Sequence, residues 1–212
     1  MAHLRHPTLE RLVQYYQFIR ALPPGDDACS SSQISKCAGV DSTSVRRDLA
    51  AIGVRGCTCL GYRTADVLRA IEDTLGMGRT HRAVIVGAGR LGCALASYPF
   101  YVPCGLVIVA LLDVDPTKFG LRVNGIPIEP VARLRTRVGR EGVSLAMLAV
   151  PADAAQNAAV LLVRAGIRAI WNFSPANLHV PRGVFVRHEQ LSVGLGVITH
   201  HLNRCAGRTR AG

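Results

Sequence analysis

A Gly-x-Gly-x-x-Gly motif that begins at Gly87 is the stretch of this sequence with the clearest chemical meaning. It follows the apolar run 83–86 directly and leads into the small-residue stretch 93–97, which we expect to be helical. A strand, a glycine-rich turn and a helix in this order are typical of a dinucleotide-binding βαβ unit, whose helix N-terminus holds the pyrophosphate. Gly87 would permit the tight turn, Gly89 would let the backbone approach the ligand, and Gly92 would let helix and strand pack closely.

An acidic residue lies where such a motif requires one. The apolar run 106–112 predicts the next strand, and Asp113 ends that strand 21 residues after Gly92. The dinucleotide-binding pattern places its ribose-binding carboxylate roughly 20 residues after the glycines, and a carboxylate there repels the 2′-phosphate of NADPH. We therefore predict that NADH or NAD⁺ binds at Gly87, Ala88, Gly89, Arg90, Leu91, Gly92 and Asp113. A glycine-rich connection that binds nothing is the alternative.

Two later loops belong to the same prediction. Val150 and Pro151 end one apolar run, and Asn172 and Phe173 end the next. Ligands of open α/β sheets bind beyond the carboxyl ends of the strands, so these four residues are candidates for the nicotinamide side of the site. Ordinary loop chemistry is the alternative.

The first eighty residues carry a different pattern. Apolar spacing predicts helices over 8–21 and 33–38 and a third helix capped by Asp41 or Ser42. Two helices around a short glycine-containing turn are typical of a helix-turn-helix. Hydroxyls in the first turn of the third helix and two arginines one turn later suit phosphates and base edges: Ser42, Thr43, Ser44, Arg46 and Arg47. A small helical bundle with an exposed polar face is the alternative.

Composition restricts the class of protein. The chain has 212 residues, of which 49% are hydrophobic and 18% charged, as in a well-buried globular protein. No apolar run approaches the roughly 20 residues of a membrane span, and the N-terminus has no signal-peptide pattern, so we expect a cytoplasmic protein. The net charge of +11 suggests an anionic partner, yet the first 80 residues carry 10 basic and 8 acidic side chains. Nucleic acid bound there needs a local basic patch.

The cysteines suggest neither a disulfide framework nor a metal site. There are seven, an odd number at scattered positions, and in a reducing compartment we expect mostly free thiols. Cys57-x-Cys59 is not a familiar zinc spacing, and no nearby pair of His or Cys completes a ligand set. We expect no bound metal.

Turn residues and apolar spacing organise the remainder. Glycines and β-forming residues over 53–62 suit a small hairpin or wing, a helix is expected over 64–75, and Gly76 to Gly78 mark a domain boundary. Asn124-Gly125 predicts a tight hairpin-like turn. Further helices are expected over 131–139, 152–165 and 190–204, with strands over 143–150, 167–173 and 184–186. The arginines of the first of these helices are expected to form mostly a solvated face: Arg133, Arg135, Arg137 and Arg140.

Over about residues 7–202 the chain resembles the Rex family of redox-sensing transcriptional repressors. The resemblance rests on the order and spacing of several short segments, none decisive alone. They are Arg11-Leu12 with Tyr15-Tyr16, Val40 to Ser42 with Val45 to Asp48, Gly61-Tyr62, Val86 to Gly92, Val150 to Ala152 with Ala154 to Gln156, and Asn172 to Pro175 through Leu178 and Val180-Pro181.

The resemblance implies an α/β chain in three parts. A winged-helix DNA-binding domain over 1–78 would precede a Rossmann-type NAD(H)-binding domain with a parallel sheet over 79–189. A dimerisation helix and tail over 190–212 would be exchanged between the subunits of a homodimer. Such a dimer represses transcription by binding an inverted repeat in double-stranded operator DNA, is released by NADH, and is kept on DNA by NAD⁺.

The family also extends the candidate sites. Tyr98 and Phe100 match its aromatic stretch near the nicotinamide, and Phe173 matches another residue there. On the DNA side the implied contacts include Ser31, Lys36, Arg55, Gly61 and Tyr62. An enzyme is not implied: a dehydrogenase needs a proton-transferring group placed against a substrate, and no histidine lies in such a constellation.

Several positions depart from the family pattern. Cys57-Thr58-Cys59 stands where the wing usually has Lys or Arg with Gly, which predicts fewer phosphate contacts and leaves open a protein that has lost DNA binding. Val13 replaces a family proline. Gln190 stands where the family usually has an acid, and if that acid pairs with the position of Arg11, the latch between domains is altered here.

Overall fold

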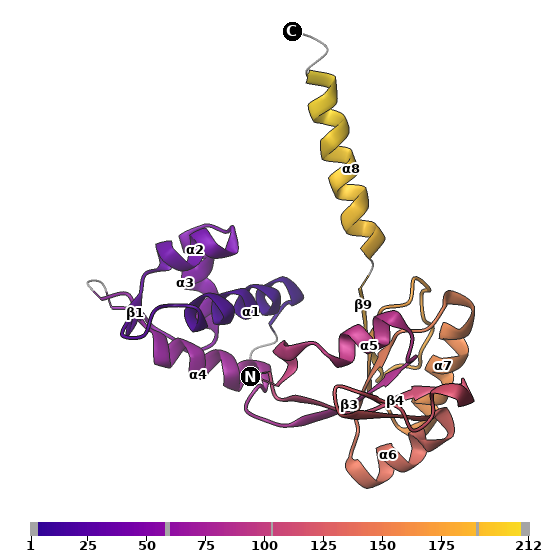
Figure 1. The fold of residues 1–212 in the computed structure, drawn as a ribbon. Helices are drawn as coiled ribbons and strands as arrows, with labels where there is room; N and C mark the ends of the chain where they lie inside the picture. The colour runs from indigo at the N-terminus through magenta and orange to yellow at the C-terminus, as the bar shows by residue number, and fades with distance from the viewer. Residues whose placement is uncertain (1–3, 58–59, 103, 190, 209–212) are drawn as a thin grey trace. The chain divides into compact units, whose positions relative to one another are not determined.

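The computed structural model describes residues 4–57, 60–102, 104–189 and 191–208. The chain forms two compact units, residues 1–79 and 80–212 (Figure 1). The division falls one residue after the boundary expected at 78. Among the described residues, every helix is too short or too polar to span a bilayer.

Four helices and a two-stranded sheet make up the first unit. Helix α1 spans His6–Arg20, α2 Ser31–Ala38, α3 Ser42–Ala51 and α4 Thr64–Leu75. Strand β1 (Ala28–Cys29) pairs antiparallel with β2 (Tyr62–Arg63), which joins the segment before α2 to the segment before α4. Both helices of the helix-turn-helix pair have fully buried side chains in a shared core, Ile34 from α2 and Val45 and Leu49 from α3.

Local hydrogen bonds fix both helices of this pair. Ser30 caps α2 in a reciprocal capping box with Gln33, and Gly39 ends the helix in the left-handed conformation. Of the two residues expected to cap α3, Asp41 does so, accepting a hydrogen bond from the Ser44 N–H at 2.8 Å. The hairpin expected over 53–62 has a bridge between Cys57 and Gly61, and residues 58–59 of the wing lie outside the described residues.

A seven-stranded sheet forms the centre of the second unit, in the order β5-β6-β4-β3-β7-β8-β9. All neighbours pair in parallel except β5 with β6. The strand bounds are His81–Val86 for β3, Leu106–Asp113 for β4, Arg122–Val123 for β5, Ile126–Pro130 for β6, Leu145–Leu148 for β7, Ala169–Asn172 for β8 and Phe185–His188 for β9.

Helices cover both faces of this sheet. They are α5 (Arg90–Ala96), α6 (Leu134–Glu141) and α7 (Ala152–Ala165). Three short 3₁₀ turns are η1 (Pro99–Tyr101), η2 (Pro116–Lys118) and η3 (Val131–Arg133), and the terminal helix α8 spans Leu191–Arg208. Alternate residues of β3 enter different cores. Val84 and Val86 pack with α6 and α7, whereas Ile85 packs with Ala96 of α5 and with Tyr101. Burial on both faces is what a central parallel strand requires.

Three expectations for the second unit need correction. Helix α5 begins at Arg90, inside the glycine motif, rather than at residue 93. The region 131–139 starts as a 3₁₀ turn, and its α-helix runs from Leu134 to Glu141. Arg137 is not part of a solvated face, because its guanidinium pairs with Glu129 of β6 and with Glu141.

Candidate functional site

A cavity of about 460 Å³ lies at the carboxyl ends of β3, β4 and β7. Five of the predicted cofactor residues line it: Gly87, Gly89, Asp113, Val150 and Pro151. Because β3 and β7 are adjacent parallel strands, the glycine turn and the Val150-Pro151 loop open at the same edge. The sheet topology thus brings together the two loops that the sequence places more than 60 residues apart.

Each of the three positions of the motif requires glycine for a different structural reason. Gly87 has a φ of +101°, and a Cβ there would stand 2.4 Å from the carbonyl oxygen of Ala149. A Cβ at Gly92 would stand 1.8 Å from the carbonyl oxygen of Gly87, so α5 can approach the strand only without a side chain at this position. A Cβ at Gly89 would meet nothing within 4 Å. The space beside Gly89 is therefore free for a ligand, as the pyrophosphate role requires.

Asp113 is held at the end of β4 by three donors. Its carboxylate accepts hydrogen bonds from the backbone N–H of Ala88 at 2.7 Å, from that of Asp115 at 2.9 Å and from the ammonium of Lys118 at 3.1 Å. Burial acts to raise the pKa of the Asp113 carboxyl, but these three interactions outweigh burial and hold the pKa below its usual value. An ionised carboxylate at this position fits the hydroxyls of a ribose.

Sequence reasoning missed the wall of the cavity opposite the glycines. One face of α7 contributes Ala154, Asn157, Ala158 and Leu161, and Lys118 and Val131 complete the lining from the segments after β4 and β6. The helical spacing of the α7 residues was present in the sequence and would have identified this face. The lining is mainly apolar, which suits an adenine ring.

The remaining predicted cofactor residues lie outside this cavity. Ala88, Arg90, Leu91 and Gly92 belong to the turn and first residues of α5. Asn172 needs a correction. Its side chain is fully buried, and its amide is used internally by the carbonyl of Ala176, the N–H of Ser174 and the ring of His188. Asn172 therefore shapes the loop after β8 and does not offer its amide to a ligand.

Aromatic rings gather beyond the glycine turn. Tyr98 lies edge-on to Tyr101 with ring centres 5.2 Å apart, Tyr101 lies 6.3 Å from Trp171, and Trp171 lies 4.9 Å from Phe173. The two predicted nicotinamide residues Tyr98 and Phe173 thus belong to one aromatic cluster. Phe100 lies in η1, between Tyr98 and Tyr101.

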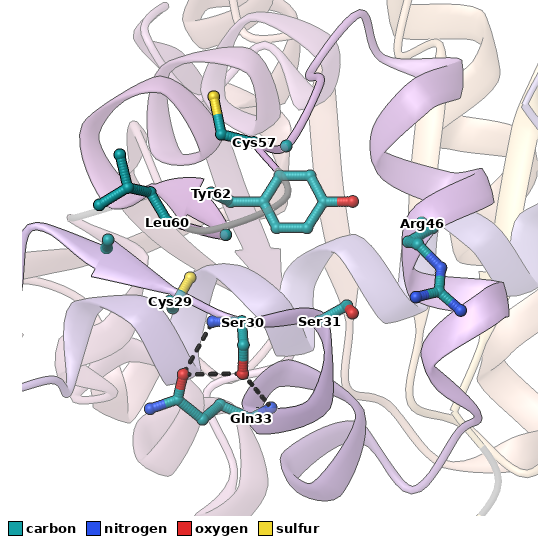
Figure 2. Close-up of a pocket in the computed structure, with 11 residues that line it drawn as sticks. Cys29, Ser30, Ser31, Gln33, Arg46, Cys57, Leu60 and Tyr62 are labelled. Carbon is teal, nitrogen blue, oxygen red and sulfur yellow. Dashed lines mark hydrogen bonds between the residues drawn. The ribbon is translucent and has the colours of Figure 1, made fainter.

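A second cavity, of about 550 Å³, lies in the first unit beside the helix-turn-helix (Figure 2). Four predicted DNA contacts line it: Ser31, Arg46, Gly61 and Tyr62. Figure 2 shows the Tyr62 hydroxyl directed toward the side where Arg46 lies. Burial raises the pKa of the Tyr62 phenol, against the opposing effect of the positive Arg46, so the hydroxyl stays protonated at neutral pH and can donate. Ser31, Arg46 and Tyr62 together provide polar donors suited to phosphate oxygens.

Position 61 lines this cavity, and it also requires glycine for a structural reason. Its φ is +73°, and a Cβ there would stand 2.5 Å from the carbonyl oxygen of Cys29. Only glycine lets the base of the wing lie against β1.

The other predicted DNA contacts differ in how exposed their side chains are and in which internal hydrogen bonds they make. Arg46 lies 3.3 Å from the hydroxyl of Thr43, and Arg47 lies 3.3 Å from that of Ser44, so both guanidinium groups lie along the exposed face of α3. Ser42 and Thr43 begin this helix, and Lys36 is exposed in the last turn of α2. Ser44 is a weaker candidate than the sequence suggested, since its hydroxyl donates to the capping carboxylate of Asp41 at 2.7 Å.

Arg55 lines a third cavity, of about 420 Å³, on the other side of the wing. Arg63 and Arg69 line it too, together with the carboxylates of Asp66 and Asp73. Basic side chains thus lie next to the wing although Cys57-Thr58-Cys59 carries none. The two carboxylates reduce the net positive charge of this groove.

Arg11, one of the two residues of the expected latch, forms an ion pair within the first unit. Its guanidinium donates to both oxygens of Asp48, at 2.7 and 2.8 Å, within the first unit. Tyr15 adds a hydrogen bond of 2.9 Å to the same carboxylate. Gln190, the other residue of the expected latch, lies outside the described residues, so the altered latch stays a prediction.

The described part of the chain shows no cluster of side chains for metal binding and no histidine in the nucleotide cavity. Among these residues, no three His, Cys, Asp or Glu side chains gather in a way that could hold a metal ion. Cys29, Cys37, Cys57, Cys93 and Cys104 are free thiols. His188 faces the buried amide of Asn172, and His179 donates its backbone N–H to Gln156, so neither lies in the nucleotide cavity.

Comparison with known families matches the two units separately. A family described as "Putative DNA-binding protein N-terminus" matches residues 6–50, and one described as "CoA binding domain" matches residues 79–176. The first match covers α1, α2 and most of α3, and the second covers the sheet from β3 to β8.

Curated relatives align over almost the whole chain. The "Redox-sensing transcriptional repressor Rex" of Syntrophomonas wolfei is 38% identical over 196 residues, which cover 92% of this chain and 93% of the relative. The protein of the same name from Streptomyces coelicolor is 37% identical over 205 residues, 96% of this chain and 80% of the relative. Both are named as repressors and not as enzymes.

Solved structures give the same result. The structure described as "RSP in complex with beta-NAD+ and operator DNA" matches with a TM-score of 0.89 at 30% identity, covering 99% of this chain and 97% of that chain. The structure described as "RSP in complex with beta-NADH" matches with a TM-score of 0.87 at 30% identity, covering 100% of both chains. The similarity therefore extends through both units.

Proposed function

Since this chain belongs to the Rex family of redox-sensing transcriptional repressors, we propose that it represses transcription as a homodimer on operator DNA and is released from it when NADH is bound. The relatives' structures contain NAD⁺ with operator DNA in one case and NADH in another. We assign the same two ligands to this chain. Both are found in the cytoplasm, where we place the protein.

The observation that carries this proposal is the cavity at the glycine turn. Gly89 leaves room for a pyrophosphate beside the N-terminus of α5, and Asp113 presents an ionised carboxylate at the position of the ribose. The apolar face of α7 supports an adenine ring. Gly87, Ala88, Gly89, Arg90, Leu91, Asp113, Val150 and Pro151 stay our proposed cofactor residues, with Gly92 as the close contact that sets the turn.

The aromatic cluster supports a preference for NADH over NAD⁺. The nicotinamide ring is neutral in NADH and positively charged in NAD⁺. An apolar site near Tyr98 and Phe173 penalises burial of the charged ring more than that of the neutral ring. A ligand shifts a conformational equilibrium only by its differential affinity for the two states, so NADH must bind the DNA-free form more tightly.

Operator binding is assigned to the face that α3 and the second cavity form. Arg46 and Arg47 lie on the exposed side of α3, while Val45 and Leu49 on the opposite side are fully buried. Ser31, Lys36, Ser42, Thr43, Arg46, Arg47, Arg55, Gly61 and Tyr62 are the proposed contacts or supports. The charge-bearing members supply phosphate contacts, and the first turn of α3 supplies contacts to base edges.

Binding of the purified protein to a family-type inverted repeat tests this function. Fluorescence anisotropy at a stated salt concentration would measure the operator Kd alone, with NADH and with NAD⁺. We expect sequence-specific binding that NADH relieves and NAD⁺ does not. NADH binding without any operator binding would instead identify a protein that has lost its DNA output, and hydride transfer to a 2-hydroxy acid or an aldehyde would support a dehydrogenase.

A further inference from the structure

Trp171 packs against Phe173, one of the proposed nicotinamide residues. It lies in β8, two residues before Phe173, and the two rings are 4.9 Å apart with an interplanar angle of 41°. Tyr101, which follows α5 and thus the glycine turn, is 6.3 Å from the same indole. The indole therefore contacts rings from both segments that border the proposed nicotinamide position.

The polar edge of the same ring is bonded to the segment that leads into α8. The indole N–H of Trp171 donates to a carboxylate oxygen of Glu189 at 3.2 Å. The backbone N–H of Glu189 donates to the carbonyl of Asn172 at 2.8 Å, and the side chain of Arg187 donates to the same carboxylate oxygen at 3.0 Å. Glu189 lies two residues before Leu191, the first residue of α8. Two contacts thus connect Phe173 with the beginning of the terminal helix.

The hydrogen bond between the Trp171 indole and the Glu189 carboxylate is costly to break. A partly buried indole N–H requires an acceptor, and a hydrogen bond to a carboxylate is roughly twice as strong as one between neutral groups. A displacement of the start of α8 would draw Glu189 away from the indole, and a shift of the indole would draw Glu189 with it. The position of the ring and that of the helix start are therefore energetically linked.

We propose that Trp171 is a positioning residue that couples the occupancy of the nicotinamide site to α8 through Glu189. The inference rests on the proposed function and deepens it, because it names the residues that carry the cofactor signal out of the Rossmann unit. Trp171 need not contribute to NADH affinity in this role. The signature of the role is a loss of coupling while the two individual binding steps are retained.

The experiment measures three quantities for wild type and variants. Calorimetry gives the NADH Kd, and anisotropy gives the operator Kd without NADH and with saturating NADH; the quotient of the last two is the release ratio. For Trp171→Phe and Glu189→Ala we expect the first two constants to stay within twofold of wild type and the release ratio to fall at least fivefold. The double variant should lose no more than either single variant, since both remove the same bond.

Two conservative variants provide matched controls. Glu189→Gln keeps an oxygen acceptor for the indole and should retain the release ratio within twofold. Arg187→Gln removes the other side-chain partner of Glu189 and leaves the indole bond, and it should also retain the ratio. An unchanged release ratio in both Trp171→Phe and Glu189→Ala would overturn the proposal, as would losses that multiply in the double variant.

Hydrogen–deuterium exchange separates this inference from the proposed function. In wild type, NADH should change the exchange of amides in α8, and the change should be absent in Trp171→Phe at saturating NADH. That result would support the coupling even if no operator binding is found. A protein that binds NADH with no response in α8 would refute the coupling, and a protein that binds no NADH would refute the proposed function and this inference together.

Discussion

Asp113 joins the end of β4 to the glycine turn after β3, because its carboxylate accepts the backbone N–H of Ala88 at 2.7 Å. The same carboxylate is the proposed ribose ligand. One side chain thus stabilises the turn and faces the cavity, and Lys118 at 3.1 Å balances its charge. Removing the charge should affect both the ligand and the choice between cofactors.

Asp113→Asn should weaken NADH binding at least tenfold, since an amide replaces a charged acceptor for the ribose hydroxyls. It should also raise the affinity for NADPH relative to NADH, because Lys118 loses its main partner and repulsion of a 2′-phosphate disappears. Titration of the fluorescence of Trp171, the single tryptophan, measures both ligands. Asp115→Asn, two residues away and outside the cavity, is the control; equal losses in both variants would contradict the assignment.

Two glycine substitutions should separate folding from ligand binding. Gly92→Ala places a methyl group 1.8 Å from the carbonyl oxygen of Gly87, so we expect a lower melting temperature and no NADH binding. Gly89→Ala meets nothing within 4 Å in the protein and should leave the melting temperature within about 2 °C, a range typical of surface substitutions. It should nevertheless abolish NADH binding by blocking the pyrophosphate. Normal NADH binding by Gly89→Ala would remove that residue from the site.

The Arg11–Asp48 pair should govern the stability of the first unit. Asp48→Asn leaves the guanidinium of Arg11 without its charged partner, and we expect a loss of about 2–3 kcal/mol in the free energy of unfolding. Denaturant unfolding of the full chain, monitored by circular dichroism, measures this loss in free energy. Asp41→Asn, a cap exposed to solvent, is the control and should cost less.

The same pair predicts a pH dependence. Burial acts to raise the pKa of Asp48, but the hydrogen bonds from Arg11 and Tyr15 outweigh burial, and the pKa in the folded protein is lowered. A carboxyl with a lowered pKa contributes its full stabilisation above the unfolded value of about 3.9 and loses it as pH falls through the folded value. Unfolding of wild type should therefore become easier below about pH 4. Asp48→Asn should show a smaller dependence on pH in that range.

Arg46→Ala should weaken operator binding at least tenfold, because it removes a charged donor at the rim of the second cavity. Arg55→Ala should weaken binding to operator and unrelated DNA alike and lower the slope of log Kd against log salt by about one. Anisotropy over a series of salt concentrations distinguishes the two patterns. Arg20→Ala, in the last turn of α1, is the control. Unchanged operator affinity in Arg46→Ala would remove α3 from the interface.

Patterns that depend on neighbours in sequence were predictable. The glycine motif with Asp113, and the cap that Asp41 provides for α3, follow rules that involve only a few consecutive residues or a fixed spacing. The fold class expected from the sequence is confirmed by the solved structures of the family, which match over both units.

Side-chain contacts made after the chain has folded were not predictable in this way. The sequence predicts that most arginines of 133–140 are solvated and does not single out Arg137, because its partner Glu129 lies on a strand of only five residues. The position of Asn172 at a strand end predicts a cofactor contact, but the sequence does not reveal that its amide bonds to Ala176 and His188. Arg137 and Glu129 are 8 residues apart and Asn172 and His188 are 16 apart, and no fixed sequence spacing predicts such contacts between different elements.

Among the side chains of α8 that the structure describes, five large apolar ones are exposed: Val193, Leu195, Val197, Ile198 and Leu202, each between 56% and 63% accessible. Burying them against a second copy makes association depend on protein concentration. If only dimers occupy an inverted repeat, operator occupancy at low expression rises with the square of protomer concentration. At concentrations well below the dimer dissociation constant, halving the protein supply removes about three quarters of the dimers by mass action. In that concentration range, gene dosage would act on operator occupancy beside the redox state of the nicotinamide pool.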